Sequence, residues 1–140
     1  MSLFEISSIK RTGQTAKNAA QLPALTLAYI GDTVYDLFIR TMLLETMDGN
    51  AHKLHLAATK YVCAAAQAAA FRKIEPLLTE EETREFHRGR NAHSGSVPKN
   101  ASVTDYRTAT GLEALFGYLY WTNRDDRIRE LMMIILNDEV

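Results

Sequence analysis

Residues 28–36 read Ala28-Tyr29-Ile30-Gly31-Asp32-Thr33-Val34-Tyr35-Asp36 and place one acid, Asp32, inside an almost wholly apolar stretch. From Leu22 to Leu44 the chain offers apolar residues on every helical face, so we expect a helix that is surrounded by protein. A carboxylate in such a helix is costly unless it is paired, hydrogen-bonded or bound to a metal. Glu113 repeats this situation in a second apolar stretch. We therefore expect the two carboxylates to meet in the core, where a bound divalent cation would stabilise them.

The totals describe an ordinary soluble protein. The chain has 140 residues, of which 46% are hydrophobic and 24% charged, and we expect one domain over residues 1–140 with its motifs in about 22–121. No apolar run reaches the ~18 residues of a membrane span, and the N-terminus lacks the pattern of a secretory signal. Cys63 is the only cysteine, which excludes an internal disulfide and favours the cytoplasm. We expect Cys63 to be a small buried residue.

The periodicity of the chain predicts an all-α fold. No stretch alternates apolar and polar residues in the manner of a strand, and helical signals recur instead. We expect helices at about 23–45 and 51–72, followed by a polar helix that a capping box at Thr79 and Glu82 opens and that ends near Gly89. Residues 89–100 have the composition of a loop, and two helices follow it, with a turn at 122–123 between them.

Glycines beside the two acids indicate close helix contact. Gly31 costs its helix up to about 1 kcal/mol of propensity, so it needs a packing or functional reason. Gly111 and Gly117 flank Glu113 in the same way. Few carboxylates and an open side suit Mg²⁺ and metal-assisted phosphodiester hydrolysis.

Structural explanations of the same acids stay open. Asp32 has the alternative of pairing with an arginine or capping a neighbouring helix. Asp36 shares a helix face with Asp32, but it also lies four residues before Arg40, which favours a helical ion pair over a ligand role.

Four short motifs carry a family resemblance. Residues 30–34 resemble the centre of the ribonuclease III signature, which supplies a catalytic Asp, and residues 112–120 resemble the second acidic motif of that family, which supplies a metal-ligating Glu. With residues 54–59 and 88–92, they resemble the Mini-ribonuclease III group, a catalytic domain without a double-stranded-RNA-binding domain. The chain departs from ribonuclease III proper at three acidic positions, which are occupied here by Leu25, Ala28 and Thr110.

The resemblance implies a single ribonuclease III-type endonuclease domain that forms a homodimer and cleaves double-stranded RNA with Mg²⁺, leaving a 5′-phosphate. It implies that Asp32 and Glu113 are catalytic and bind the metal, with Asp36, Thr110 and water as candidates for the remaining ligands. The implied role is maturation of large-subunit ribosomal RNA in bacteria, where a ribosomal protein or the ribosome itself presents the precursor.

A local excess of positive charge indicates where RNA would bind. The net charge of −1 argues against binding by bulk electrostatics, but residues 86–107 carry four basic residues and one acid. A basic loop suits the phosphates and 2′-hydroxyls of a duplex. The candidate contacts are Arg88, Arg90, Asn91, Ser94, Lys99 and Arg107.

Two other classes of function stay open. One is a non-catalytic RNA-binding or ribosome-assembly module that uses the same basic loop. The other is a metal-dependent hydrolase of small phosphate esters, which would need an enclosed pocket and more histidine ligands than this chain offers.

Overall fold

The computed structural model describes residues 16–92, 97, 99 and 102–137. Its elements are α1 (Ala16–Gln21), α2 (Ala24–Thr46), α3 (Ala51–Val62), α4 (Ala64–Ile74), the 3₁₀ turn η2 (Glu75–Leu77), α5 (Glu80–Asn91), α6 (Val103–Trp121) and α7 (Asp125–Leu136). None of the described residues forms a strand, so the predicted all-α class is confirmed. No helix within the described ranges has the length and apolar character needed to cross a membrane.

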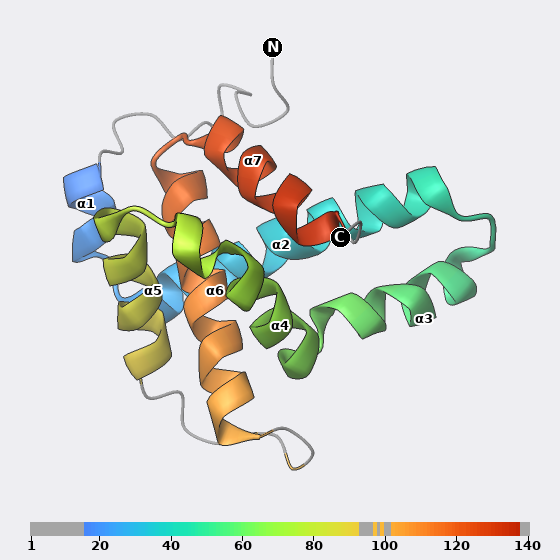
Figure 1. Ribbon diagram of the computed structural model, residues 1–140, viewed down its shortest axis with the longest axis horizontal. Coiled ribbons are helices and arrows are strands. Elements are labelled where there is room, and N and C mark those ends of the chain that lie inside the picture. Colours follow the sequence, from blue (N-terminus) through green and yellow to red (C-terminus); the bar gives the residue numbers. More distant parts are fainter. Residues whose placement is uncertain (1–15, 93–96, 98, 100–101, 138–140) are drawn as a thin grey trace.

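Helix α6 is the centre of the bundle. It packs against α2, α4 and α5, and Figure 1 shows it running between α5 and α4 and crossing α2. Leu112, Leu115, Phe116 and Leu119 of α6 have no exposed surface. The apolar stretch around Glu113 is therefore core, and Glu113 itself lies half-buried at the edge of this core.

Glycine contacts set the crossing of α2 and α6. A Cβ atom added to Gly31 would lie 1.7 Å from the backbone oxygen of Glu113, and one added to Gly117 would lie 1.9 Å from the backbone oxygen of Leu27. Only glycine fits at such distances, so the two backbones touch. This is the close contact that the glycines predict, and it sets Asp32 beside Glu113.

Helix α5 looks polar in sequence but has a buried face. The capping box is present, with the Thr79 side chain accepting a hydrogen bond from the Glu82 backbone and the Glu82 side chain accepting one from the Thr79 backbone. Glu82 is buried, and its carboxylate accepts hydrogen bonds from Nε and Nη2 of Arg127 on α7, each at 2.8 Å. Burial raises the pKa of Glu82, but the contacts with Arg127 outweigh it and hold that pKa below its ordinary value.

The predicted helix at 51–72 is wrong in one respect, because it breaks at Cys63. Cys63 adopts φ −68° and ψ 158°, an extended conformation between α3 and α4. The break lets α3 pack against α2 while α4 packs against α6, and one straight helix would not reach both. The expectation that Cys63 is buried is also wrong, because the break leaves its side chain exposed.

Helix α2 is only partly surrounded by protein, contrary to expectation. Its inner face is buried, but an apolar stripe on the outer face is exposed, with Tyr29 80% exposed. Figure 1 shows the C-terminal half of α2 extending beyond the bundle together with α3. The other exposed members of this stripe are Leu25, Leu37 and Leu44. We call these four residues the α2 stripe.

Candidate active site

Asp32 and Glu113 come together from α2 and α6. Asp32 is exposed at the surface, whereas Glu113 is half-buried. Burial raises the pKa of Glu113 to about 8, helped by the charge of Asp32 and a hydrogen bond shared with it. Near neutral pH the pair therefore holds a proton that a cation could replace. The two acids meet at this crossing as the sequence predicts. The expectation that they meet in the core is wrong, because Asp32 is exposed and only Glu113 reaches inward.

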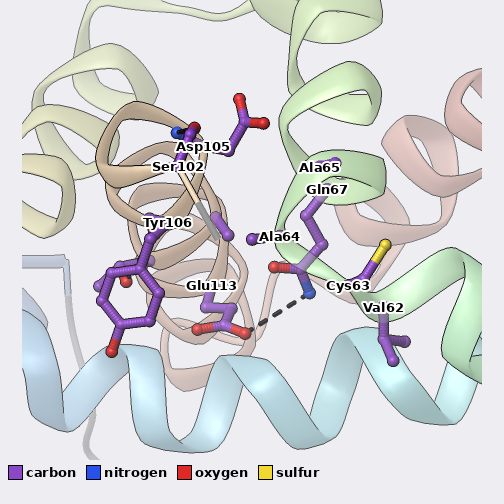
Figure 2. Close-up of a pocket in the computed structure, with 11 residues that line it drawn as sticks. Val62, Cys63, Ala64, Ala65, Gln67, Ser102, Asp105, Tyr106 and Glu113 are labelled. Atoms are coloured by element: carbon purple, nitrogen blue, oxygen red, sulfur yellow. Dashed lines mark hydrogen bonds between the residues drawn. The ribbon is translucent and has the colours of Figure 1, made fainter. Parts of the chain in front are cut away.

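Gln67 is a third polar group at the site, and the sequence analysis missed it. Its side chain comes from α4, is 1% exposed, and donates a hydrogen bond from Nε2 to Oε2 of Glu113 at 3.4 Å. Figure 2 shows the amide reaching the carboxylate. A signal was present, because Gln67 is the one polar residue in the alanine-rich run 64–70.

A cavity of about 500 Å³ opens beside Glu113. It lies between the start of α4 and the N-terminal half of α6, and Figure 2 shows Gln67 and Glu113 together at one end of it. A water molecule occupies about 30 Å³ in the liquid, so the cavity has room for a hydrated ion and part of a ligand. Its lining residues are Val62, Cys63, Ala64, Ala65, Gln67, Ser102, Asp105, Tyr106, Ala109, Thr110 and Glu113.

The two further ligand candidates differ in position. Asp36 Oδ2 pairs with Arg40 Nε at 2.8 Å, as the four-residue spacing predicts, so its charge is already balanced. Thr110 lines the cavity, and its hydroxyl donates to the backbone oxygen of Tyr106 at 3.0 Å. In the part of the chain that the structure describes, no group of three His, Cys, Asp or Glu residues could hold a metal ion.

The chemistry of the donor set still fits a hard cation. Two carboxylates at one point are the ligands that Mg²⁺ prefers, and this ion commonly keeps several waters. The adjoining cavity leaves space for those waters. Asp32 and Glu113 are therefore a sufficient protein contribution for a site whose other ligands are water or substrate.

Arg88 has a role inside the fold. Its Nη1 lies 2.6 Å from Oε1 of Glu85, and its Nη2 donates to the backbone oxygen of Leu22. The contact with Leu22 ties α5 to the short connection between α1 and α2. Both of its terminal nitrogens thus already have protein partners, although its predicted contact with RNA stays a prediction.

The other residues of the basic segment face solvent where they are described. Arg90, Asn91, Lys99 and Arg107 are exposed. Arg90 lies over the ring of Phe86, 5.9 Å from its centroid, and donates from Nε to Oδ1 of Asn91 at 3.4 Å. Ser94 lies outside the described residues.

Comparisons with known proteins identify the family of the chain. The family profile described as the ribonuclease III domain matches residues 25–124. The chain is 45% identical to a Mini-ribonuclease 3 of Clostridium tetani over 124 residues, 88% of this chain and 82% of that one. It is 46% identical to a Mini-ribonuclease 3 of Enterococcus faecalis over 114 residues, 80% of this chain and 86% of that one.

A solved structure shares the fold. The crystal structure of a protein from Fusobacterium nucleatum superposes with a TM-score of 0.77 at 28% sequence identity, covering 86% of this chain and 96% of that one. The family profile spans both Asp32 and Glu113. The chain therefore belongs to the ribonuclease III family, in its Mini-ribonuclease III group.

Proposed function

We propose that this protein is a Mg²⁺-dependent endoribonuclease that cleaves double-stranded RNA. The observation that carries the proposal is the pairing of Asp32 with Glu113 at the glycine contact of α2 and α6, next to an open cavity. Two like charges in one place are unfavourable unless a proton or a cation neutralises them. Membership in the ribonuclease III family supports a nuclease over the other classes of function.

In the proposed mechanism Asp32 and Glu113 would hold Mg²⁺. When bound, the ion would polarise the scissile phosphate and activate water for in-line attack, so that one product keeps a 5′-phosphate. The protein keeps the two carboxylates at a fixed separation, because the backbones of α2 and α6 touch at Gly31. Thr110 and Asp36 are the further candidate ligands, and Thr110 has the better position because it lines the cavity.

RNA binding is proposed for the basic segment. Arg90, Lys99 and Arg107 are exposed cations, two of them within the predicted loop at 89–100 and Arg107 on α6 beyond it. Together with Arg88, Asn91 and Ser94 they would contact phosphates and 2′-hydroxyls, which are what a duplex offers a protein in its wide, shallow minor groove. Few contacts per subunit imply modest affinity that falls as salt rises.

A homodimer is proposed from the α2 stripe. The stripe runs along the same helix as Asp32 and exposes several large apolar side chains at helical spacing. A core within one subunit does not account for them, because they face solvent. Pairing of α2 with a second copy would cover the stripe and bring two active sites onto one duplex.

The biological setting is proposed from the family resemblance. We propose that the substrate is the precursor of large-subunit ribosomal RNA in bacteria, cut in the cytoplasm with a ribosomal protein or the ribosome presenting it. The modest expected affinity is consistent with such help.

Cleavage of a labelled RNA duplex at low salt with Mg²⁺ tests the activity. The native chain is compared with Asp32→Asn and Glu113→Gln after circular dichroism has established that all three are folded. Cutting by the native chain alone is the expected result. Binding that is equal in all three without any cutting would favour the non-catalytic RNA-binding or ribosome-assembly module, which the small acidic set keeps as the second candidate.

A further inference from the structure

Gln67 places a polar amide at a fully buried position of α4, where an apolar side chain is expected. Residues 64–70 are otherwise alanines, and the other large buried side chains of α4, Phe71 and Ile74, are apolar. A buried amide costs free energy unless it is hydrogen-bonded. Among the described residues, the recorded hydrogen bond of the Gln67 side chain is the one to Oε2 of Glu113.

We propose that Gln67 is a positioning residue, which holds the Glu113 carboxylate in the orientation that binds the cation. This inference rests on the proposed function, since it assigns Glu113 as a metal ligand. The long side chain of glutamate has several rotatable bonds, and ordering it costs conformational entropy. A donor that is fixed on a packed helix orders the carboxylate before the cation arrives.

The geometry favours this role over simple space filling. An apolar side chain of similar volume would fill the same space on α4 at no polar cost. Gln67 instead directs its one recorded hydrogen bond to the acid that meets Asp32, across 46 residues of sequence. Figure 2 shows that the contact lies at the cavity, on the side of Glu113 that faces α4. The neighbouring buried positions Ala68 and Ala70 carry no such group.

The variant Gln67→Met tests the proposal, because methionine keeps the length and approximate volume of the side chain but donates no hydrogen bond. The first measurement is the affinity of the folded chain for Mn²⁺ without RNA, by electron paramagnetic resonance. Loss of a residue that orients a ligand typically weakens metal binding by about 10- to 100-fold, and we expect a drop in this range. The second is cleavage against Mg²⁺ concentration, where we expect a higher half-saturating concentration and a smaller change in the maximal rate.

Phe71→Leu is the matched control on the same helix. Phe71 is 5% exposed, stacks on Phe86 of α5 with ring centroids 3.7 Å apart, and does not line the cavity beside Glu113. We expect this change to lower the melting temperature and to leave Mn²⁺ affinity as it is. An equal loss of Mn²⁺ affinity in both variants would make the effect a general one of α4 packing and would overturn the proposal.

The remaining outcomes distinguish failure of the role of Gln67 from failure of the proposed nuclease function. Native Mn²⁺ affinity in a folded Gln67→Met, with duplex cleavage intact, would overturn the role of Gln67 and leave the nuclease standing. A folded native chain that neither binds Mn²⁺ nor cuts duplex RNA would overturn the metal site and the role of Gln67 together. Should Gln67→Met fail to fold, Gln67→Asn replaces it, because its amide is one methylene too short to reach Glu113, and the same Mn²⁺ criterion applies.

Discussion

Gly31 lies so close to Glu113 that a Cβ atom on the glycine would be 1.7 Å from the glutamate backbone oxygen. The acid pair thus depends on a residue that has no side chain. Asp32 follows Gly31 directly, so the register of α2 against α6 decides where both carboxylates point. The proposed active site and the central packing contact of the fold therefore involve the same few residues.

The first prediction concerns that contact. Gly31→Ala should destabilise the protein by at least about 1–3 kcal/mol, the usual cost of overpacking, because a backbone and not a flexible side chain stands in the way. Urea denaturation measures the free energy of unfolding. Thr33→Ala, at an exposed position on the same helix, should change it by no more than about 0.5 kcal/mol. Equal stability of Gly31→Ala and the native chain would contradict the crossing described here.

The second prediction is that metal affinity rises with pH between about 6.5 and 9. The pKa of Glu113 is raised to about 8, so below that pH the cation must displace a proton. Mn²⁺ titrations at three pH values across this range measure the effect. Affinity that is constant over the range would mean that Glu113 is already ionised at pH 6.5.

The third prediction concerns stability without metal. The pKa of Glu113 rises from about 4.5 in the unfolded chain to about 8 in the folded one. The contribution of Glu113 to the free energy of unfolding therefore falls as pH rises from about 4.5 to about 8. Asp32→Asn removes the like charge and should raise the free energy of unfolding at pH 8.5 by up to about 1 kcal/mol, since Asp32 is exposed and solvent screens its charge. Urea denaturation in a chelator at pH 5 and pH 8.5 measures it, and the gain should shrink at pH 5.

The fourth prediction concerns assembly. Tyr29→Lys should convert the proposed homodimer to a monomer and reduce cleavage of duplex RNA, because it puts a charge at the most exposed position of the α2 stripe. Light scattering coupled to size exclusion gives the mass. Leu56→Lys, at an exposed apolar position on α3 that is 50% exposed, should keep the native mass. A native chain that is monomeric at all accessible concentrations would refute the dimer.

The fifth prediction distinguishes arginines that face solvent from Arg88, which has partners within the fold. The double variant Arg90→Ala with Arg107→Ala should weaken duplex RNA binding and reduce its salt dependence, with little change in stability, because both side chains are exposed. Arg88→Ala should lower stability by about 1–3 kcal/mol, since it leaves the buried Glu85 carboxylate without its partner. Filter binding at several salt concentrations and thermal melts measure the two effects. RNA affinity and salt slope that stay native in the double variant would remove these residues from the interface.

Much of the candidate site could be predicted because short stretches of sequence indicate it. Asp32 and Glu113 stand out as acids in apolar helices, and Gly31 and Gly117 indicate the crossing that joins them. Helix α2 and the capping box at Thr79 follow from periodicity and cap chemistry, and both are confirmed.

The rest depended on tertiary partners that no local pattern reveals. The break at Cys63 has no Pro or Gly to signal it, and it arises because α3 and α4 pack on different helices. The role of Gln67 depends on an acid 46 residues away. Periodicity also marks Tyr29 only as apolar, and cannot tell a residue that faces the core from one that faces a partner.

The buried pair of Glu82 and Arg127 limits how far the enzyme can be trimmed. The family profile ends at residue 124, yet Arg127 reaches back from α7 and also donates to the backbone oxygen of Leu77. A fragment cut at residue 124 would remove Arg127, the counter-charge of the Glu82 carboxylate, and break this buried ion pair. A minimal stable fragment therefore has to include α7, although no residue of α7 lines the cavity beside Glu113.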